Sequence, residues 1–444
     1  MLLTLVGSYF LIKMRFFFVL HPIRTVTKAV RSIKDRRAFR SFSLALAGTL
    51  GVGNVFGVAL AIMIGGAGSL FWLFVSMLFA MVIKYAEVVI TSDNLYHDTD
   101  IHGGIYYVIK ASFGRLGHLV SGVYSLAVLM LSLVLGAALQ TDAMENSVCC
   151  IIPISPVFLA VLFVVMTLAT IIGGTSKIEK ITAIIIPMTT IVYIFLTSYV
   201  IFANISGIGG VVLEILRSAF RCESAIGGCV GFLFSLPMRE GFARGILSNE
   251  AGAGTSAMAH ARSGLLSPAS AGLLGILEVW FDTGLICMLT GFSILLSVPD
   301  PETFSNGMHL VVYTVGNSLG TVGKWALVFC VFSFAFATVI CWYYYGSESW
   351  SALFGKRRRT IYLPIFLVFV GLGCFADSML LVSATDLFML AATSVTLAAL
   401  LKNSDRIRDL SELSGIISPE PGILRRLRVG KIKGSVFLRG ERGR

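Results

Sequence analysis

The chain has 444 residues, of which 56% are apolar and only 13% are charged. A soluble domain has about 25% charged residues, so this composition, with a mean hydropathy of +0.86, excludes a soluble enzyme. Because a membrane-spanning helix needs about 20 apolar residues, the apolar content is sufficient for about ten to twelve such helices. We therefore expect an all-α polytopic membrane protein.

The net charge of +11 comes from three basic blocks. Seven Lys and Arg lie between Arg24 and Arg40, four form Lys356–Arg359, and eleven lie between Lys402 and Arg444. Basic loops beside apolar spans stay on the cytoplasmic side of a membrane. We therefore expect the lipid bilayer, and no nucleic acid, as the large partner. The basic tail either serves topology alone or also touches anionic headgroups.

Eleven apolar stretches have the length and composition of membrane spans. They cover residues 1–22, 42–66, 68–91, 119–141, 153–173, 181–203, 225–258, 271–298, 322–346, 360–381 and 383–402. If the N-terminus lies outside, alternation of the spans puts all three basic blocks inside, as the positive-inside rule requires. The sequence therefore predicts a multi-pass protein of a bacterial-type plasma membrane, with its N-terminus outside and its C-terminus in the cytoplasm.

Two of these spans contain glycine clusters, one over 48–57 and one over 248–256. Glycine inside a helix costs about 0.5–1 kcal/mol relative to alanine, so such clusters favour backbone that unwinds or approaches another group closely. Unpaired backbone groups are tolerated in hydrocarbon only where protein or a polar ligand satisfies them. We expect two discontinuous helices. The alternative is a pair of glycine faces for close helix packing.

The two clusters lie about 200 residues apart, and each would open a block of five spans that run in opposite directions. This pattern predicts a five-plus-five inverted repeat with one extra helix in front. The expected parts are an extra N-terminal transmembrane helix at 1–22, a basic cytoplasmic loop at 23–41, a first five-helix repeat at 42–203, a second five-helix repeat at 225–402 and a basic cytoplasmic tail at 403–444.

Several motifs occur in an order that resembles one family over residues 40–400. They include GVGNVFGVA at Gly51–Ala59, RGILSNEAGAG at Arg244–Gly254 and WYYYG at Trp342–Gly346. These segments are similar to the alanine/glycine:cation symporters (the sodium:alanine symporter family) of the inverted-repeat amino-acid transporters. Ala67, Ala253 and Ser394-Val395 depart from the family pattern, which leaves substrate size and release kinetics open.

This resemblance implies a secondary active symporter that takes up a small neutral amino acid with sodium by alternating access. Alanine and glycine come first, and D-alanine and serine are further candidates. It implies no bound cofactor, with sodium as the co-transported cation. A proton-coupled permease, a transport-dead amino-acid sensor and a channel on the same fold stay open as alternatives. An intramembrane enzyme is disfavoured because the sequence offers no nucleophile–base set.

A zwitterionic amino acid needs N–H donors for its carboxylate and oxygen acceptors for its ammonium group. The ends of broken helices supply both. We therefore expect the substrate to be lined by Gly51, Gly53, Asn54, Gly252, Ala253 and Gly254. By resemblance Gln140 meets the substrate, although it could instead cap the outer end of the fourth span. Trp342 belongs either to the pocket wall or to the interfacial aromatic belt.

For sodium, the resemblance implies a site between the unwound backbone of the first repeat helix and a hydroxyl group on the fourth helix of the second repeat. The expected carbonyl ligands lie between Gly51 and Val55, with Gly51, Val52 and Val55 as candidates. Thr338 is the expected hydroxyl ligand, and Ser333 is the alternative.

Four charged residues are candidates for coupling or for structural pairing. Glu250 lies in the second glycine cluster, and we expect it to pair with Arg239 or Arg244. Glu278 and Asp282 are four residues apart on one helix face, so one of them needs a cation, an arginine or a proton. A proton or cation site at Asp282 is the alternative role for this group. His260 is expected at the membrane interface.

Overall fold

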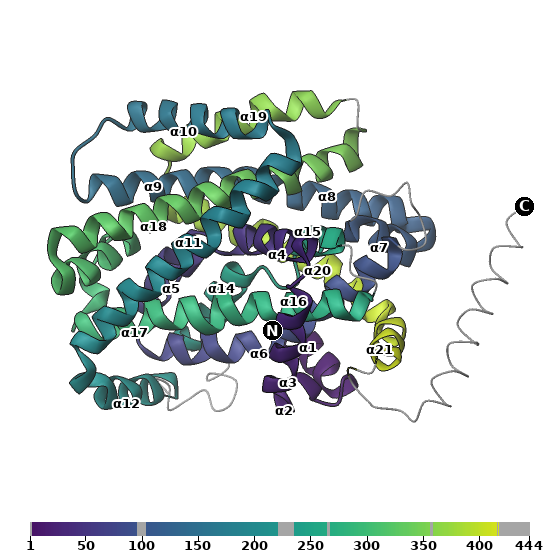
Figure 1. Cartoon of the computed structure of the whole chain (residues 1–444), viewed down its shortest axis with the longest axis horizontal. Helices are drawn as coiled ribbons and strands as arrows, with labels where there is room; N and C mark the ends of the chain where they lie inside the picture. Colours follow the sequence, from purple (N-terminus) through teal and green to yellow (C-terminus); the bar gives the residue numbers. More distant parts are fainter. Residues whose placement is uncertain are drawn as a thin grey trace, which may run out of the picture.

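The structure is a computed structural model that describes residues 2–95, 104–220, 235–263, 267–355, 358–414 and 416. Regular secondary structure in these ranges is helical. Most of the long helices run roughly side by side in the view of Figure 1, with α7 and α21 at one end. The all-α expectation is thus confirmed for the described residues.

The N-terminal region differs from the sequence prediction. Its helices are α1 (Leu2–Lys13), α2 (Phe17–Leu20) and α3 (Pro22–Ser32). Arg15 and Phe16 have φ angles of 54° and 53°, which end α1. A single helix over 1–22 is therefore wrong, and the basic segment 23–41 is mostly helical rather than a loop.

The first half of the chain continues through the first glycine cluster. Its elements are α4 (Arg36–Thr49), the 3-10 turn η1 (Val52–Asn54), α5 (Phe56–Gly65), α6 (Gly68–Leu95), α7 (Ile105–Ser112), the 3-10 turn η2 (Gly114–Leu116), α8 (Gly117–Leu133), the π-helix η3 (Val134–Ala138), α9 (Leu139–Cys149), α10 (Pro156–Ile171) and α11 (Gly174–Ala203). The chain bends by 59° between α4 and α5, so the first expected break is present.

The second half contains a second interruption, between α14 and α15. Its elements are the 3-10 turn η4 (Ile205–Gly207), α12 (Ile208–Ala219), α14 (Leu236–Asn249), α15 (Thr255–His260), the 3-10 turn η5 (Ala261–Ser263), α16 (Pro268–Val279), the π-helix η6 (Trp280–Cys287), α17 (Met288–Ser297), the 3-10 turn η7 (Pro301–Thr303), α18 (Gly307–Phe354), α19 (Arg359–Leu372), the 3-10 turn η9 (Gly373–Phe375), α20 (Ser378–Lys402) and α21 (Ser404–Leu413). Gly320, with φ 62°, kinks α18. Two segments expected to be loops, 204–224 and 299–321, therefore contain helices.

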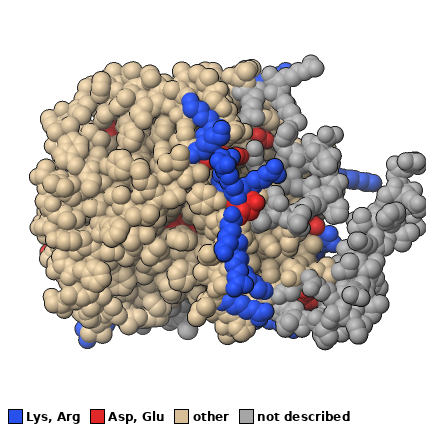
Figure 2. All heavy atoms as spheres, viewed as in Figure 1, with Lys and Arg blue, Asp and Glu red and all other residues tan. Residues whose placement is uncertain are grey.

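Among the described residues, six helices, and the bent pair α4–α5, are long and apolar enough to cross a membrane. The other expected spans, at 1–22, 153–173 and 360–381, fall on shorter helices, as does the part of 225–258 from residue 235 onward, while 225–234 lies outside the described residues. Large apolar side chains recur on the outer face of α11, where Ile184, Ile191 and Phe195 are 69%, 55% and 72% exposed. Such a face is suited to lipid. Figure 2 shows Lys and Arg gathered in a stripe beside a broad surface with few charges.

The two broken helix pairs lie near the centre of the bundle. α6 packs against α14, α15 and α16, while α18 packs against α4, α8, α9 and α11. α4 contacts α15, and α5 contacts α14, so segments about 200 residues apart in sequence are neighbours (Figure 1). This packing brings both glycine clusters into one buried region.

Candidate functional site

The break after α4 frees the backbone oxygen of Ala47. In a continuous helix the Gly51 N–H would donate to this oxygen, but here it donates to the Thr49 oxygen over 2.8 Å. The Thr338 hydroxyl of α18 lies 2.8 Å from the Ala47 oxygen, 3.0 Å from the Phe334 oxygen of its own helix and 3.5 Å from the Leu50 oxygen. One hydroxyl hydrogen serves one acceptor at a time. Oxygen lone pairs are therefore in excess at this point.

The same break frees the N–H of Val52 and the oxygen of Gly48. Gln140 Oε1 accepts from the Val52 N–H over 3.1 Å, and Trp342 Nε1 donates to the Gly48 oxygen over 3.3 Å. Both side chains are buried. Gln140 therefore lies at the first break and does not cap an outer helix end, and Trp342 is not part of an interfacial aromatic belt.

The second break is built from residues with positive φ angles. Glu250, Gly252 and Gly254 have φ angles of 54°, 92° and 71°, a region that favours glycine. A methyl group on Gly252 would lie 2.6 Å from Thr393 Cγ2. Both backbone angle and space therefore require glycine at 252, which explains why the cluster occurs here.

Side chains of neighbouring helices bind the second break as well. Tyr124 donates to the Ala253 oxygen over 2.8 Å, and Glu87 Oε1 accepts from the Gly254 N–H over 3.2 Å. The Glu250 carboxylate accepts from Trp342 Nε1 over 3.2 Å, so Trp342 contacts both breaks. These groups replace the helical partners that the interrupted backbone lacks.

The two breaks also meet directly through a polar cluster. The Asn54 amide donates to the Ser248 hydroxyl over 3.1 Å and to the Asp282 carboxylate. Ser248 and Thr283 donate to Asp282 Oδ2 over 2.6 and 2.8 Å. A methyl group on Gly53 would lie only 3.3 Å from Ser248 Cα. The structure thus brings together Gly53, Asn54 and Asp282, as a shared site requires.

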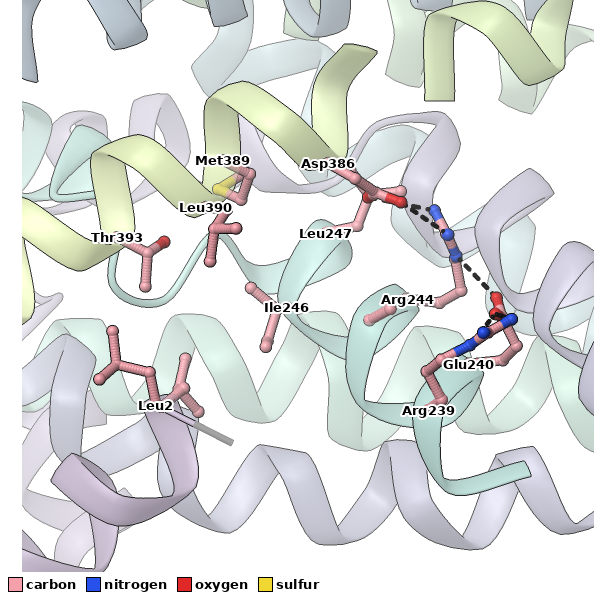
Figure 3. Close-up of a pocket in the computed structure, with 12 residues that line it drawn as sticks. Leu2, Arg239, Glu240, Arg244, Ile246, Leu247, Asp386, Met389, Leu390 and Thr393 are labelled. Atoms are coloured by element: carbon pink, nitrogen blue, oxygen red, sulfur yellow. Dashed lines mark hydrogen bonds and ion pairs between the residues drawn. The ribbon is translucent and has the colours of Figure 1, made fainter. Parts of the chain in front are cut away.

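The expected pairing of Glu250 with an arginine is wrong. Arg244 donates to the two Asp386 oxygens over 2.9 and 3.4 Å and lies 3.5 Å from Glu240, while Arg239 pairs with Glu240 over 3.1 Å. Figure 3 shows these pairs from α14 and α20 at the edge of a cavity of about 470 Å³ that also touches α1. Arg244 therefore connects α14 to α20 and Arg239 pairs within α14, so neither arginine neutralises the break.

Glu278 and Asp282 have separate partners, so they do not compete for one cation. Glu278 lies 3.3 Å from the Lys84 ammonium and 2.6 Å from His260 Nε2, and all three side chains are fully buried. The interfacial expectation for His260 is therefore wrong. Lys84 and Glu87 are site residues that the sequence analysis missed, although ionisable groups inside an apolar span were the available signal.

Ser333, the alternative hydroxyl ligand for sodium, does not lie on the same side of its helix as Thr338. Ser333 lies five residues before Thr338 in α18, about 140° around the helix, so the two hydroxyl groups face different sides. Ala47 and Leu50, which the sequence analysis did not single out, supply the oxygens beside Thr338.

Interrupted helices whose freed peptide groups meet inside a buried helical bundle define a class of protein, the secondary membrane transporters. Residues 1–410 match the model of the sodium:alanine symporter family. The chain belongs to this family, which confirms the resemblance seen in the sequence.

Two curated relatives and one solved structure show how the chain compares. It is 27% identical to the sodium/alanine symporter AgcS of Methanococcus maripaludis, over 90% of this chain and 86% of the relative. It is 28% identical to the probable sodium/glutamine symporter GlnT of Bacillus subtilis, over 90% and 84%. A Na⁺-coupled sialic acid symporter structure matches with a TM-score of 0.54 at 11% identity, covering 93% of this chain and 86% of the other. This last match concerns the fold alone.

Proposed function

We propose that this protein takes up a small neutral amino acid, alanine or glycine, together with sodium by alternating access. D-alanine and serine are further substrates of this chemistry. The observation that most favours the proposal is that the backbone groups freed at the first break are bound by polar side chains, with no charged group among them. Neutral donors and acceptors of this kind suit a zwitterion.

The substrate lies between the two breaks in this proposal. Gln140 holds the Val52 N–H with an amide oxygen, and a substrate carboxylate oxygen is an acceptor of the same geometry. Trp342 reaches both breaks and walls the site. The full proposed lining is Gly51, Gly53, Asn54, Gln140, Gly252, Ala253, Gly254 and Trp342. The glycines let the ligand approach the backbone closely, which favours a small side chain.

Sodium lies beside Thr338 in this proposal. Hard cations prefer oxygen ligands, and the Thr338 hydroxyl and the Ala47 and Leu50 carbonyl groups converge there. The unwound stretch that begins at Gly51 is adjacent and supplies the carbonyl groups expected from the sequence, those of Gly51, Val52 and Val55. Ser333 is the weaker candidate because it faces another side of α18.

Gly51 links the two proposed sites. A methyl group on this residue would lie 2.8 Å from both Gln140 Oε1 and Thr338 Oγ1. Sodium at Thr338 orders the same stretch of backbone that Gln140 and the substrate contact. Each ligand then raises the affinity of the other by the same factor, and each charge moved adds about 2.3 kcal/mol of driving force per 100 mV.

The Arg244–Asp386 pair is the proposed outer gate. Arg244 lies on the half-helix α14 six residues before Glu250, so it is about 9 Å along the helix from the second break. Its partner Asp386 belongs to α20 and is partly exposed, whereas Arg244 is buried. Opening a path to the site along this side requires the two charges to separate.

The topology is part of the proposal. Repeats at 42–203 and 225–402 are supported by the matching positions of the two breaks. The basic stripe in Figure 2 supports a cytoplasmic side at the end where α7 and α21 lie, with the N-terminus outside, as alternation of the spans predicts.

The test is uptake of labelled alanine into proteoliposomes that contain the purified full-length protein. An inward sodium gradient should drive concentrative uptake, while an equal potassium gradient should not. Excess unlabelled glycine should compete, and competition by glutamine would extend the substrate range to that of one relative. Uptake driven only by a pH gradient would favour a proton-coupled permease, and sodium-independent equilibration would favour a channel.

A further inference from the structure

Glu87 is a buried carboxylate that the proposed function does not yet use. It lies on α6 and is fully buried. Oε1 accepts from the Gly254 N–H, and the Gly252 N–H also lies close to the carboxylate, but among the described residues Oε2 makes no hydrogen bond. A buried carboxylate oxygen without a partner is costly, so a ligand is expected beside it.

The charges around Glu87 do not balance. Lys84, one turn before it on α6, interacts with Glu87, Glu250 and Glu278. The ammonium of Lys84 pairs closely with Glu278, which also contacts His260. Asp282 also interacts with Glu250 and Glu278, so one ammonium faces four carboxyl groups, and when these are ionised the cluster has an excess of negative charge whether the histidine is neutral or protonated.

Neutral donors satisfy Glu250 but not Glu87. Both Glu250 oxygens accept hydrogen bonds, from Trp342 and from Thr255. Tyr124, the remaining titratable neighbour on α8, directs its hydroxyl hydrogen to the Ala253 oxygen. The oxygen without a donor is therefore Glu87 Oε2, and a cation or a proton there would offset part of the excess charge. An excess charge in a buried cluster is strongly unfavourable unless a cation or a proton compensates it.

We propose that Glu87 binds a second co-transported monovalent cation, a sodium ion or a proton, at the α14–α15 break. This inference rests on the proposed symport and adds a site that is separate from Thr338. The position explains how the cation acts: Glu87 holds the N–H of Gly254, so a cation on its other oxygen changes the order of the backbone that lines the substrate.

The decisive measurement counts charges per alanine in proteoliposomes. Sodium and pH are equal on both sides, and a potassium diffusion potential of 100 mV, inside negative, is the only driving force. Each co-transported charge raises the equilibrium accumulation of alanine by about 50-fold at this potential. The wild-type protein should move two charges, and a value of one charge would overturn the proposal.

The variants Glu87→Gln and Glu302→Gln test the residue itself. Glu302 is an exposed carboxylate in the 3-10 turn η7, so its variant controls for loss of formal charge. Glu87→Gln should lower the equilibrium accumulation about 50-fold, which is one charge at 100 mV, and Glu302→Gln should leave it unchanged. Unchanged accumulation in Glu87→Gln would overturn the proposal, because a role limited to substrate affinity or helix structure cannot alter an equilibrium ratio.

A binding measurement tests the proposal even if the Glu87→Gln variant folds but does not transport alanine. Calorimetry of alanine binding to the purified full chain gives the slope of log affinity against log sodium concentration, or against pH. For Glu87→Gln one of these slopes should fall by one, and which slope falls identifies the cation. Two unchanged slopes would refute the site. Glu87→Asp, which retains the carboxylate, should restore both slopes.

The outcomes separate this site from the proposed function. If Thr338 is not the sodium site, Thr338→Val keeps the wild-type sodium dependence of uptake while Glu87→Gln still loses one charge. If the protein does not couple alanine to any cation, the wild-type ratio itself stays at one.

Discussion

Replacement of Thr338 by valine tests the sodium site most directly. Valine has the same shape as threonine but lacks the hydroxyl group that lies 2.8 Å from the Ala47 oxygen and 3.5 Å from the Leu50 oxygen. Both side chains are β-branched and suit a helix interior equally. The variant therefore removes one oxygen ligand and little else.

The expected loss follows from the strength of one oxygen contact to a charged partner. A hydrogen bond to a charged group is worth about 1.5–3 kcal/mol, and we take the same range for a sodium–hydroxyl contact. This corresponds to a half-saturating sodium concentration about 10- to 150-fold higher. Thr338→Ser keeps the hydroxyl and should remain within about 3-fold of wild type, because only a methyl group is lost.

The assay is initial alanine uptake into proteoliposomes across a sodium titration. Thr314→Val is the matched control, because Thr314 is also buried in α18 and donates to the Leu310 oxygen over 2.8 Å. Its bond matches the one that Thr338 makes within its own helix, to the Phe334 oxygen over 3.0 Å, but it lies away from the break, so Thr314→Val should keep the wild-type sodium dependence. A half-saturating sodium concentration that is unchanged in Thr338→Val, or that shifts equally in Thr338→Val and Thr314→Val, would refute a sodium site at Thr338.

Three further predictions concern other contacts. Trp342→Phe removes the N–H that binds Glu250, so calorimetric alanine affinity should fall about 10-fold or more; wild-type affinity would contradict this. Asp386→Asn weakens the outer gate, so a thiol reagent should label Cys287, beside Ser248, several-fold faster than in the wild type. This faster labelling should disappear when Cys287→Ala is added to the variant. Lys84→Met breaks a buried ion pair, so the free energy of unfolding in detergent should fall by about 3–5 kcal/mol. The double variant Lys84→Met with Glu278→Met should regain part of this free energy. An unchanged free energy of unfolding in Lys84→Met would mean that the pair does not stabilise the protein.

The sequence was most informative where backbone geometry demands a residue type. Gly252 and Gly254 have positive φ angles, so their cluster marked the second break correctly. Gln140 was expected at the site from the family resemblance, and its amide oxygen accepts from a freed N–H. The positions of the glycines depend on local chemistry that the sequence expresses directly, whereas Gln140 needed the family pattern.

Partners that are distant in sequence could not be predicted in the same way. Arg244 has a nearby carboxylate at Glu250, yet it binds Asp386, 142 residues away. The reason is that Glu250 adopts a left-handed conformation and turns toward Trp342 and Thr255. The end of α1 at Arg15 and Phe16 has no glycine to mark it.

Two π-helical segments have a consequence for how the transport site can change over generations. The segment Val134–Ala138 ends two residues before Gln140, and Trp280–Cys287 contains Asp282. A π turn holds one residue more than an α turn, so deleting a single residue there closes it to an α turn and leaves the helix beyond it facing nearly the same way. In a regular α-helix the same deletion would rotate everything beyond it by about 100°. These two helices can thus lose one codon at the π turn and still present the side chains beyond it to the cargo.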